Sequence, residues 1–552
     1  MQNLKLTSCL WERTLLHLEF SSDIELQEDD KIKLIPDNVD FHATGDSDED
    51  GGKATKASSI KLTMTGVRHE GPHGLCLRPM VGYKGNPILP GDYEILVERA
   101  GETANIDATR DVVHPKPATF KRTDIMVFNR SSSFYQVVPT TRNGHLWLHI
   151  EARGVPNAFH YEARRNVANA AKAFVKAVGS NAMIGAYYVF KALHKVNPNK
   201  IAFVSDSRVN ISGNMEPLYQ RMQERGIMDT YKVKTSFIQS MDAERRSLGR
   251  YLQLAKLMAT SKVIFCDDFH PYLYKVRLRP EQRLVQLWHA CGHFKTVGFG
   301  RVGTLDAGAP FTNNHRTYTD VIVASDSDVP YYAEAFGILD DKIRPLGIPR
   351  HDWLLNPNWQ DQRRQEFQTK FPKAAGKKVI VFAPTFRGSG KRSAYYEYGR
   401  WDFEKLAQFC RDNSYYFIFK LHPFITEPVP LPADSDDVFA DGTPIREIND
   451  ILPSTDVLIT DYSSVVYEAS LLDIPTLYFA YDLEDYVSTR DFYTPYESFV
   501  SGPIVRTFDE LLRHIKEEDF DLDRLQAFKT NNFKYHDSNS CDRIIDQIIL
   551  EQ

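Results

Sequence analysis

Apolar and polar positions divide the chain into three consecutive patterns. Short apolar runs such as LLHLEF, DYEILVE and HLWLHIEA, separated by turn-rich stretches, predict a small antiparallel β domain over residues 1–153. Over residues 154–198 the apolar positions recur at helical spacing between arginines and lysines, which predicts a basic amphipathic helical connector. From residue 199 onward, near-continuous apolar runs alternate with helical patterns and predict an α/β fold.

The α/β part contains two successive series of apolar strands. The first comprises KIAFVSDS, KVIFCDDF, RLVQLWHA, DVIVASDS and KIRPLGIP, and the second comprises KKVIVFAPTF, YYFIFKLHPF, DVLITDYSS and PTLYFAYD. Strands of this kind separated by helices form parallel sheets that are covered on both faces. We therefore expect two Rossmann-like domains, residues 199–346 and 347–552, the second ending in a C-terminal helix. Ligands of such sheets bind beyond the carboxyl ends of the strands.

Composition narrows the class of protein. The 552 residues are too many for one hydrophobic core. A total of 67 basic and 73 acidic residues, a net charge of −6, argues against a general nucleic-acid binder. The six cysteines form no CxxC pair, which suits a reducing compartment and argues against a zinc site. Neither a signal peptide nor a run of about eighteen apolar residues is apparent, so we expect a cytoplasmic protein.

The connector at residues 154–198 has two interpretations. A basic amphipathic segment can lie on an anionic membrane surface, which would place the chain at the inner face of the cell membrane. Alternatively, its apolar side packs on the next domain while its lysines are solvated. The sequence leaves both open.

The stretch LITDYSSVVYEA places several hydroxyls and a carboxylate between a predicted strand and a predicted helix. Asp461 or a serine could cap the helix start, or the junction could bind phosphate at the helix N-terminus. Because capping needs only one such side chain, the additional hydroxyls of Thr460, Ser463 and Ser464 favour phosphate binding.

Other polar side chains follow strands of the second predicted domain. FAPTFRGSGKR supplies Thr385 and Arg387, whose guanidinium could hold a phosphate by two parallel hydrogen bonds. FKLHPF supplies Lys420 and His422, and Pro423 restricts the backbone of His422 to an extended conformation. A surface loop and a structural histidine are the alternatives, but the positions at strand ends favour a site.

Two further clusters are less specific. GIPRHD, at the crossover between the predicted domains, contains Arg350 and Asp352, which we interpret mainly as braces of the hinge. YDLEDYVSTRDFY contains Asp482 and Glu484. Their carboxylates fit either ribose hydroxyls or the capping of a helix start.

In the first predicted domain, LVQLWHACGHFKT places His289 directly after a buried strand. Histidine can accept a proton from a hydroxyl near neutral pH. His293, Lys295 and Arg301 follow and make this side basic, which suits a polyanionic acceptor. Solvated surface charge is the alternative explanation for part of this basic set.

Together these motifs resemble the CDP-glycerol/CDP-ribitol polyol-phosphate transferases of wall teichoic acid synthesis. The matching stretches are QLWHACGHFKTVGF, GIPRHD, FAPTFRG, FKLHPF, TDYSSVVYE and YDLEDYVSTRDFY, in family order over Asn199 to His536. From its tryptophan to its lysine, WHACGHFKT is one residue longer than the WHGTPLK of the glycerol-phosphate branch, and it resembles the ribitol-phosphate branch. His293 stands where a small residue is expected, which leaves open which histidine meets the acceptor.

The resemblance implies a GT-B-type pair of Rossmann-like domains, with the cytidine nucleotide on the second and with neither a cofactor nor an essential metal. His289 and His422 correspond to the two essential histidines of the family. The residues that correspond to its donor phosphate contacts are Arg387, Thr460, Ser463 and Ser464.

The predicted reaction transfers ribitol phosphate from CDP-ribitol to a lipid-linked teichoic acid primer or a growing poly(ribitol phosphate) chain and releases CMP. The alternatives are a CDP-glycerol glycerophosphotransferase, a GT-B glycosyltransferase, and a non-catalytic protein on a transferase scaffold. We predict His289 and His422 as catalytic. Donor binding is predicted for Thr385, Arg387, Lys420, Thr460, Asp461, Ser463, Ser464, Asp482 and Glu484, and acceptor binding for His293, Lys295 and Arg301.

Overall fold

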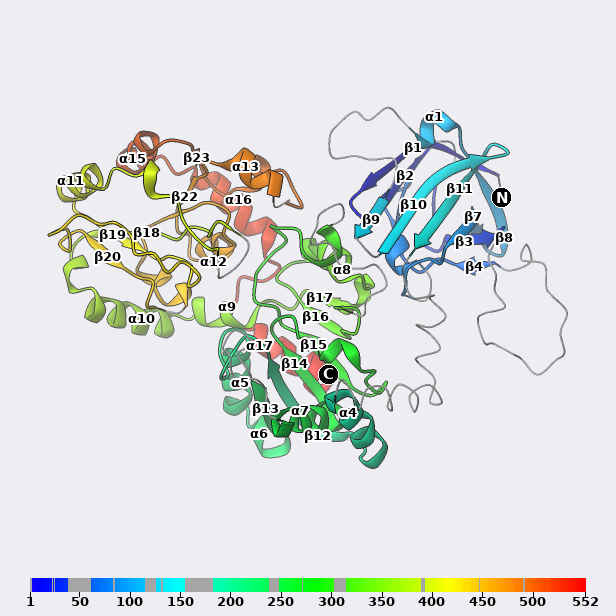
Figure 1. Cartoon of the computed structure of the whole chain (residues 1–552), viewed down its shortest axis with the longest axis horizontal. Coiled ribbons are helices and arrows are strands. Elements are labelled where there is room, and N and C mark those ends of the chain that lie inside the picture. Colours follow the sequence, from blue (N-terminus) through cyan, green and yellow to red (C-terminus); the bar gives the residue numbers. More distant parts are fainter. Residues whose placement is uncertain are drawn as a thin grey trace.

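A computed structural model of the chain contains three sheets with their helices (Figure 1). It describes all residues except 1, 22, 24, 38–60, 83–84, 115–125, 131–132, 154–181, 238–247, 271, 302–313, 389–392, 446 and 490–491.

The N-terminal sheet has eleven strands within the described part of the chain. Neighbouring strands pair antiparallel, except that β1 and β8 pair in parallel. Alternating apolar side chains face one core, which includes Trp11, Tyr93 and Tyr135. The elements are β1 (Leu4–Glu12), β2 (Leu15–Phe20), β3 (Lys31–Pro36), β4 (Leu62–Thr63), β5 (Val67–His69), β6 (Gly74–Leu77), β7 (Gly91–Arg99), β8 (Glu102–Asp107), α1 (Arg110–Val113), β9 (Met126–Arg130), β10 (Ser133–Arg142) and β11 (His145–Arg153).

The first lobe is a parallel sheet with the strand order β13-β12-β14-β15-β16-β17 and its helices. Its central strands β12, β14 and β15 are apolar on both faces because helices cover both sides. They are β12 (Asn197–Ser205), β13 (Lys232–Phe237), β14 (Ser261–Cys266), β15 (Arg283–Gln286), β16 (Asp320–Ile322) and β17 (Ile343–Arg344). The helices are α4 (Ala182–Leu193), α5 (Met215–Glu224), α6 (Ile227–Thr230), α7 (Leu248–Thr260) and α8 (Val329–Phe336).

The second lobe is a parallel sheet with the order β20-β19-β18-β21-β22-β23. Its strands are β18 (Lys378–Phe382), β19 (Tyr415–Phe419), β20 (Phe439–Asp441), β21 (Val457–Thr460), β22 (Thr476–Phe479) and β23 (Ile504–Val505). The helices are α9 (Pro349–Leu354), α10 (Pro357–Lys370), α11 (Phe403–Asn413), α12 (Val465–Leu471), α13 (Leu483–Thr489), α14 (Tyr496–Phe499), α15 (Phe508–Glu517) and α16 (Leu522–Asn532). The two parallel sheets confirm a mixed α/β fold.

The C-terminal segment returns to the first lobe. Helix α17 (Ser540–Ile544) and the π-helix Ile545–Leu550 follow α16. Ile544 and Ile548 are fully buried against the first-lobe core, which contains Ile201 and Phe203. The predicted division at residue 347 assigns this segment to the second domain, whereas its apolar side packs on the first sheet.

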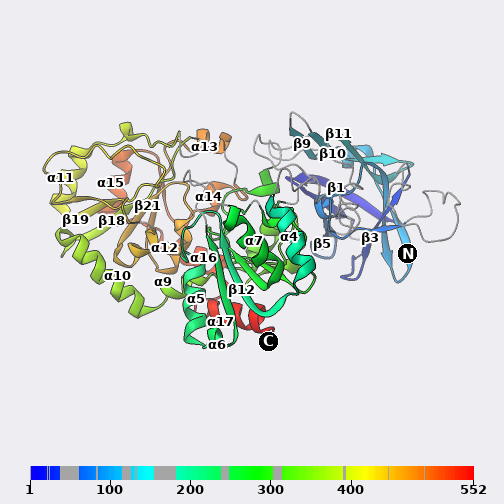
Figure 2. The same ribbon diagram turned by 60° about the horizontal axis from the view of Figure 1, so that its bottom comes forward.

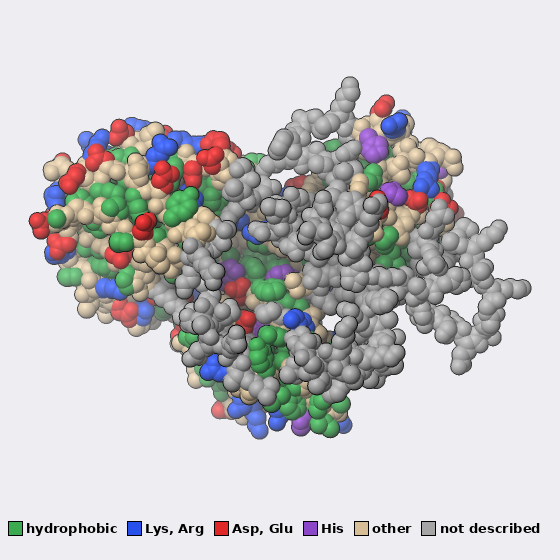
Figure 3. Space-filling model, in the orientation of Figure 1, with side chains coloured by type: hydrophobic (Ala, Val, Ile, Leu, Met, Phe, Trp, Pro, Cys, Tyr) green, Lys and Arg blue, Asp and Glu red, His purple; other side chains and the backbone are tan. Residues whose placement is uncertain are grey.

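The two lobes lie side by side (Figures 1 and 2). They meet at an apolar cluster near the carboxyl ends of their strands. Phe294 of the first lobe stacks on Phe492 and Phe499 of the second, with ring centroids 4.7 and 4.2 Å apart. In the space-filling view, histidine and acidic side chains gather where the lobes meet (Figure 3).

The predicted connector is only partly described, because residues 154–181 lie outside the description. Its remaining helix, α4, buries Met183 and Tyr187 in the first-lobe core, and it exposes Val189 and Leu193. No helix within the described residues combines the length and apolar character needed to cross a membrane.

Candidate functional site

The first lobe presents His289 beyond the carboxyl end of β15. Trp288, just before it, has a φ of 50°, so the backbone turns sharply there. The His289 side chain is about half exposed, and its Nδ1 lies 3.4 Å from Oδ1 of Asp268. Arg350 Nη1 donates to the His289 carbonyl oxygen at 2.8 Å. These contacts orient the ring through Nδ1, so that Nε2 is the nitrogen directed away from Asp268.

Sequence reasoning missed Asp268, which follows β14. Burial raises the pKa of its carboxyl, but the His289 ring and the Phe269 amide outweigh burial and hold the pKa below its usual value. The stretch KVIFCDDF could have identified it, because Asp268 follows an apolar strand there. Strands β14 and β15 are parallel neighbours, so residues that follow their carboxyl ends meet at one edge of the sheet.

The second lobe presents His422 beyond the carboxyl end of β19. Its ring lies beside Phe386 and Phe424, with centroids 4.7 and 4.5 Å away. The Phe424 amide donates to His422 Nδ1 at 3.2 Å, so the neutral ring carries its proton on Nε2. Burial, assisted by the nearby Lys420 and Lys295 ammonium groups, lowers the pKa of His422 to about 4. Near neutral pH, His422 is therefore an uncharged hydrogen-bond donor.

Lys420 and Lys295 bring positive charge to His422 from the two lobes. Lys420 is 6% exposed, and its only hydrogen bond from Nζ among the described residues goes to the Leu421 carbonyl oxygen at 3.5 Å. Burial lowers the pKa of Lys420, although Glu447 and Asp441 oppose this shift. Because an ammonium has three N–H donors, this buried group has donor capacity left for an anion.

Arg387 is the centre of a buried network rather than a free phosphate ligand. Its Nε and Nη2 donate to the two carboxylate oxygens of Asp482 at 2.6 and 2.9 Å. Its Nη1 donates to Asp461 at 2.9 Å and to the Thr385 carbonyl oxygen at 2.6 Å. Burial would lower the pKa of Arg387, but Asp461 and Asp482 outweigh it and raise the pKa. The guanidinium carbon also lies 5.1 to 5.9 Å from the ring centroids of Tyr396, Tyr462, Tyr481 and Tyr486.

The junction after β21 is held mainly by its own buried side chains. The Thr460 hydroxyl donates to the Ala383 carbonyl oxygen at 2.7 Å, and Thr460 is fully buried. Asp461 Oδ1 accepts from the amides of Thr385 and Tyr462 at 2.7 and 2.5 Å. Thr460 and Asp461 therefore tie β21 to the loop after β18 instead of facing a ligand.

Ser463 and Ser464 are the partly exposed residues of this junction. Ser463 Oγ accepts from the Val465 amide at 3.4 Å, whereas the Ser464 side chain makes no capping hydrogen bond. Helix α12 has only seven residues. Its dipole therefore contributes less to phosphate binding than the sequence led us to expect. The two hydroxyls are the groups of TDYSS that can reach a ligand.

Three residues predicted to bind the donor or the acceptor remain: Arg301, Glu484 and His293. Arg301 Nε donates to the Thr296 carbonyl oxygen at 3.1 Å. Glu484 is exposed and pairs with Arg506 at 3.2 Å, away from the Arg387 network. His293 is mostly buried.

The His293 ring is held inside the first lobe. Its Nδ1 lies 2.8 Å from Asp328 Oδ1, and the ring stacks on Tyr331 at a centroid distance of 4.1 Å. The His293 amide donates to the Tyr467 hydroxyl at 3.1 Å. These contacts fix the loop that carries His289 and Lys295 against both lobes.

Arg350 and Asp352 make bracing contacts. Arg350 Nε donates to Glu468 at 2.9 Å, which connects α9 to α12. Burial would raise the pKa of Glu468, but Arg350 and His351 lower it to about 2. Asp352 accepts from the amides of Ser540 and Cys541, at the start of the returning helix α17.

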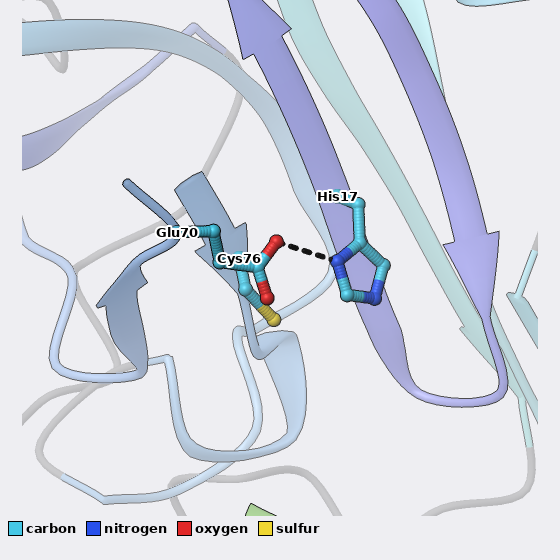
Figure 4. Close-up of side chains that lie close together, drawn as sticks. All are labelled: His17, Glu70 and Cys76. Carbon is cyan, nitrogen blue, oxygen red and sulfur yellow. Dashed lines mark hydrogen bonds and ion pairs between the residues drawn. The ribbon is translucent and has the colours of Figure 1, made fainter. Parts of the chain in front are cut away.

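Two groups of three side chains bring possible metal ligands within 4.8 Å of one another. They are His17, Glu70 and Cys76 (Figure 4), and Cys291, His351 and Glu468. In each group the carboxylate already pairs with an arginine, Glu70 with Arg68 at 2.8 Å and Glu468 with Arg350. Because a neighbouring guanidinium repels a cation, we interpret both groups as ion-pair clusters.

Comparisons with known proteins identify the family and relatives of this chain. The family model described as CDP-Glycerol:Poly(glycerophosphate) glycerophosphotransferase matches residues 186–550. Two teichoic acid ribitol-phosphate polymerases of Staphylococcus aureus (strain NCTC 8325 / PS 47) are similar. TarK is 42% identical over 65% of this chain and 70% of its own length, and TarL is 42% identical over 65% of each. The solved structure of the wall teichoic acid polymerase TagF has a similar fold, with a TM-score of 0.57 at 20% identity over 70% of this chain and 98% of that one.

Proposed function

This chain belongs to the CDP-glycerol:poly(glycerophosphate) glycerophosphotransferase family, and we propose that it transfers ribitol phosphate from CDP-ribitol to a hydroxyl of a teichoic acid acceptor. The products are CMP and an acceptor extended by one ribitol phosphate. Similarity to ribitol-phosphate polymerases and the long WHACGHFKT loop support ribitol rather than glycerol. The acceptor is a lipid-linked primer or a growing poly(ribitol phosphate) chain.

One observation carries the proposal. Lys295 lies on the same first-lobe loop as His289 and reaches the second lobe, where its Nζ lies 5.3 Å from the ring centroid of Tyr486. Its charge also helps to lower the pKa of His422. Groups that can accept a proton and groups that can hold an anion are thus brought together at the junction of the lobes. Phosphoryl transfer requires mainly positioning and electrostatic stabilisation, which such groups supply.

The reaction is a direct displacement at phosphorus. The acceptor oxygen attacks the phosphorus that bears ribitol, the bond from this phosphorus to the CMP oxygen breaks, and the acceptor proton passes to Nε2 of His289. Asp268 holds the other ring nitrogen and stabilises the imidazolium that forms. The Nε2–H of His422 donates to the departing phosphate, and the Lys420 ammonium balances its charge.

On the donor side, we distinguish groups that touch CDP-ribitol from groups that position them. Direct contacts are assigned to His422, Lys420, Ser463 and Ser464. Positioning is assigned to the buried Thr385, Arg387, Thr460 and Asp461, and to the partly buried Asp482. Glu484, exposed and paired with Arg506, receives neither role.

On the acceptor side, the proposal follows a GT-B-type arrangement in which the first lobe receives the acceptor. Lys295 and Arg301 attract its phosphates, whereas His293 fixes their loop. We further propose that the protein acts at the inner face of the cell membrane. The exposed apolar side chains of Val189 and Leu193 on α4 support this location.

Separate incubations with CDP-ribitol and CDP-glycerol test the function. With a lipid-linked teichoic acid primer, we expect CDP-ribitol to release CMP and the product mass to increase by ribitol phosphate units. CDP-glycerol should react more slowly. Faster transfer from CDP-glycerol would assign the glycerol reaction, and a sugar nucleotide that released a nucleoside diphosphate would assign a glycosyltransferase.

Replacing Asp268 by asparagine tests the orientation of His289. We expect kcat to fall on the order of ten- to a hundredfold, because a partner of the reacting group is lost. The KM for CDP-ribitol should stay constant, because its assigned contacts lie on the second lobe. Asp267→Asn is the matched control, because Asp267 is the preceding residue but pairs with Arg208. An unchanged kcat in Asp268→Asn would contradict the role.

A further inference from the structure

The tip of the β1–β2 hairpin binds the first lobe. Arg13 Nε donates to Glu334 Oε2 at 3.0 Å. The amide and hydroxyl of Thr14 donate to Glu334 Oε1 at 3.1 and 2.8 Å. Glu334 lies on α8 and is 3% exposed, and a buried carboxylate is stable only with partners of this kind. The N-terminal sheet is therefore attached to α8 by a specific polar contact.

The same arginine reaches the second lobe. Its guanidinium carbon lies 4.9 Å from the ring centroid of Tyr493, a distance typical of a cation–π contact. Tyr493 belongs to the segment between α13 and α14, and it is 6% exposed. Arg13 thus touches α8 of the first lobe and this segment of the second lobe simultaneously.

The Tyr493 segment in turn holds the loop that carries Lys295. The Tyr493 amide donates to the Phe294 carbonyl oxygen at 3.2 Å. Lys295 and Phe492 form a backbone bridge, and the rings of Phe294 and Phe492 stack at 4.7 Å. The Lys295 ammonium also lies 5.3 Å from the ring centroid of Tyr486, so contacts lead from the hairpin tip to the loop that carries His289 and Lys295.

The hairpin tip is itself held firmly. Arg13 has a φ of 55°, which is unfavourable for a residue other than glycine and persists where surrounding contacts impose it. Glu12 pairs with Arg13 at 2.7 Å, and His17 lies 3.5 Å from Glu12. His17 also lies 2.7 Å from Glu70 (Figure 4). The contacts therefore favour one orientation of the guanidinium.

We propose that Arg13 is a positioning residue, through which the N-terminal sheet holds the two lobes and the Lys295 loop in the arrangement needed for transfer. This inference rests on the proposed function. The groups assigned to CDP-ribitol lie mostly on the second lobe and keep their own partners without Arg13. Loss of Arg13 should therefore impair the transfer step more than donor binding.

The test compares Arg13→Met with Arg78→Met in the full chain. Arg78 is a matched control, because it also joins the N-terminal sheet to the first lobe, through Asp340 at 2.6 Å. For Arg13→Met we expect kcat to fall on the order of ten- to a hundredfold with little change in the KM for CDP-ribitol. Amide hydrogen exchange should become faster in residues 291–297 and 492–496. Arg13→Lys, which keeps the charge, should restore part of the loss.

For Arg78→Met we expect lower thermal stability, with normal kcat and normal exchange in those two segments. Equal changes in both variants, or unchanged exchange in Arg13→Met, would overturn the proposal. Hydrogen exchange tests whether Arg13 holds the Lys295 loop in place, independently of turnover. If the unaltered protein transferred no ribitol phosphate, the proposed function would fail while the exchange comparison still tested the contact.

Discussion

Replacing His289 by alanine is expected to lower kcat by roughly 10²- to 10⁴-fold, the contribution usual for a general base. The acceptor hydroxyl would lose the group that takes its proton. CDP-ribitol should still bind with nearly unchanged affinity, because its assigned contacts lie on the second lobe. Steady-state turnover and equilibrium titration with CDP-ribitol measure the two quantities separately.

Two controls make this result specific. His514→Gln changes a histidine on α15, which is remote from the lobe junction, and should leave turnover unchanged. Because burial and two lysines hold the pKa of His422 at about 4, the pH dependence of kcat near neutrality should report on groups other than His422. Near-normal turnover in His289→Ala would show that another group accepts the proton.

The α/β fold can be predicted from the sequence because strands buried on both faces need apolar residues at nearly every position. KVIVF and YYFIF, which form β18 and β19, are buried along almost their whole length. The destination of the C-terminal segment cannot be predicted in this way. Ile544 and Ile548 indicate a buried helical side, but their spacing does not show which sheet covers it.

The candidate site also contains features that can be predicted from the sequence and features that cannot. A position at the end of a strand can be recognised from its neighbours in the sequence, so His289 and His422 could be proposed from the motifs that contain them. Hydrogen-bond partners, in contrast, can lie far apart in the sequence. Asp461 binds the Thr385 amide and Arg387 from 76 and 74 residues away, so these three predicted donor ligands bind one another. A strand-end carboxylate or guanidinium has the same sequence signature whether it binds substrate or another loop.

Replacing Arg387 by methionine is expected to destabilise the second lobe by about 3–5 kcal/mol, the usual cost of removing one partner from a buried ion pair. Asp461 is fully buried, and Asp482 loses the two hydrogen bonds from Arg387. The loop after β18 and the junction after β21 would lose their common partner, so affinity for CDP-ribitol should fall as well. Urea unfolding followed by hydrogen exchange in the second lobe measures the stability, and titration with CDP-ribitol measures the affinity.

A compensating variant distinguishes the effect of the unpaired carboxylates from the effect of the lost connection between the loops. Adding Asp461→Asn and Asp482→Asn to Arg387→Met removes the unpaired carboxylates, so part of the stability should return. Affinity for CDP-ribitol should remain low, because the asparagines cannot rejoin the two loops that the guanidinium connected. Arg387→Lys should also fail to restore affinity, since an ammonium cannot reproduce the two parallel hydrogen bonds to Asp482. Full affinity in Arg387→Lys or in the triple variant would mean that the network contributes stability alone, and that Ser463, Ser464 and Lys420 are positioned without it.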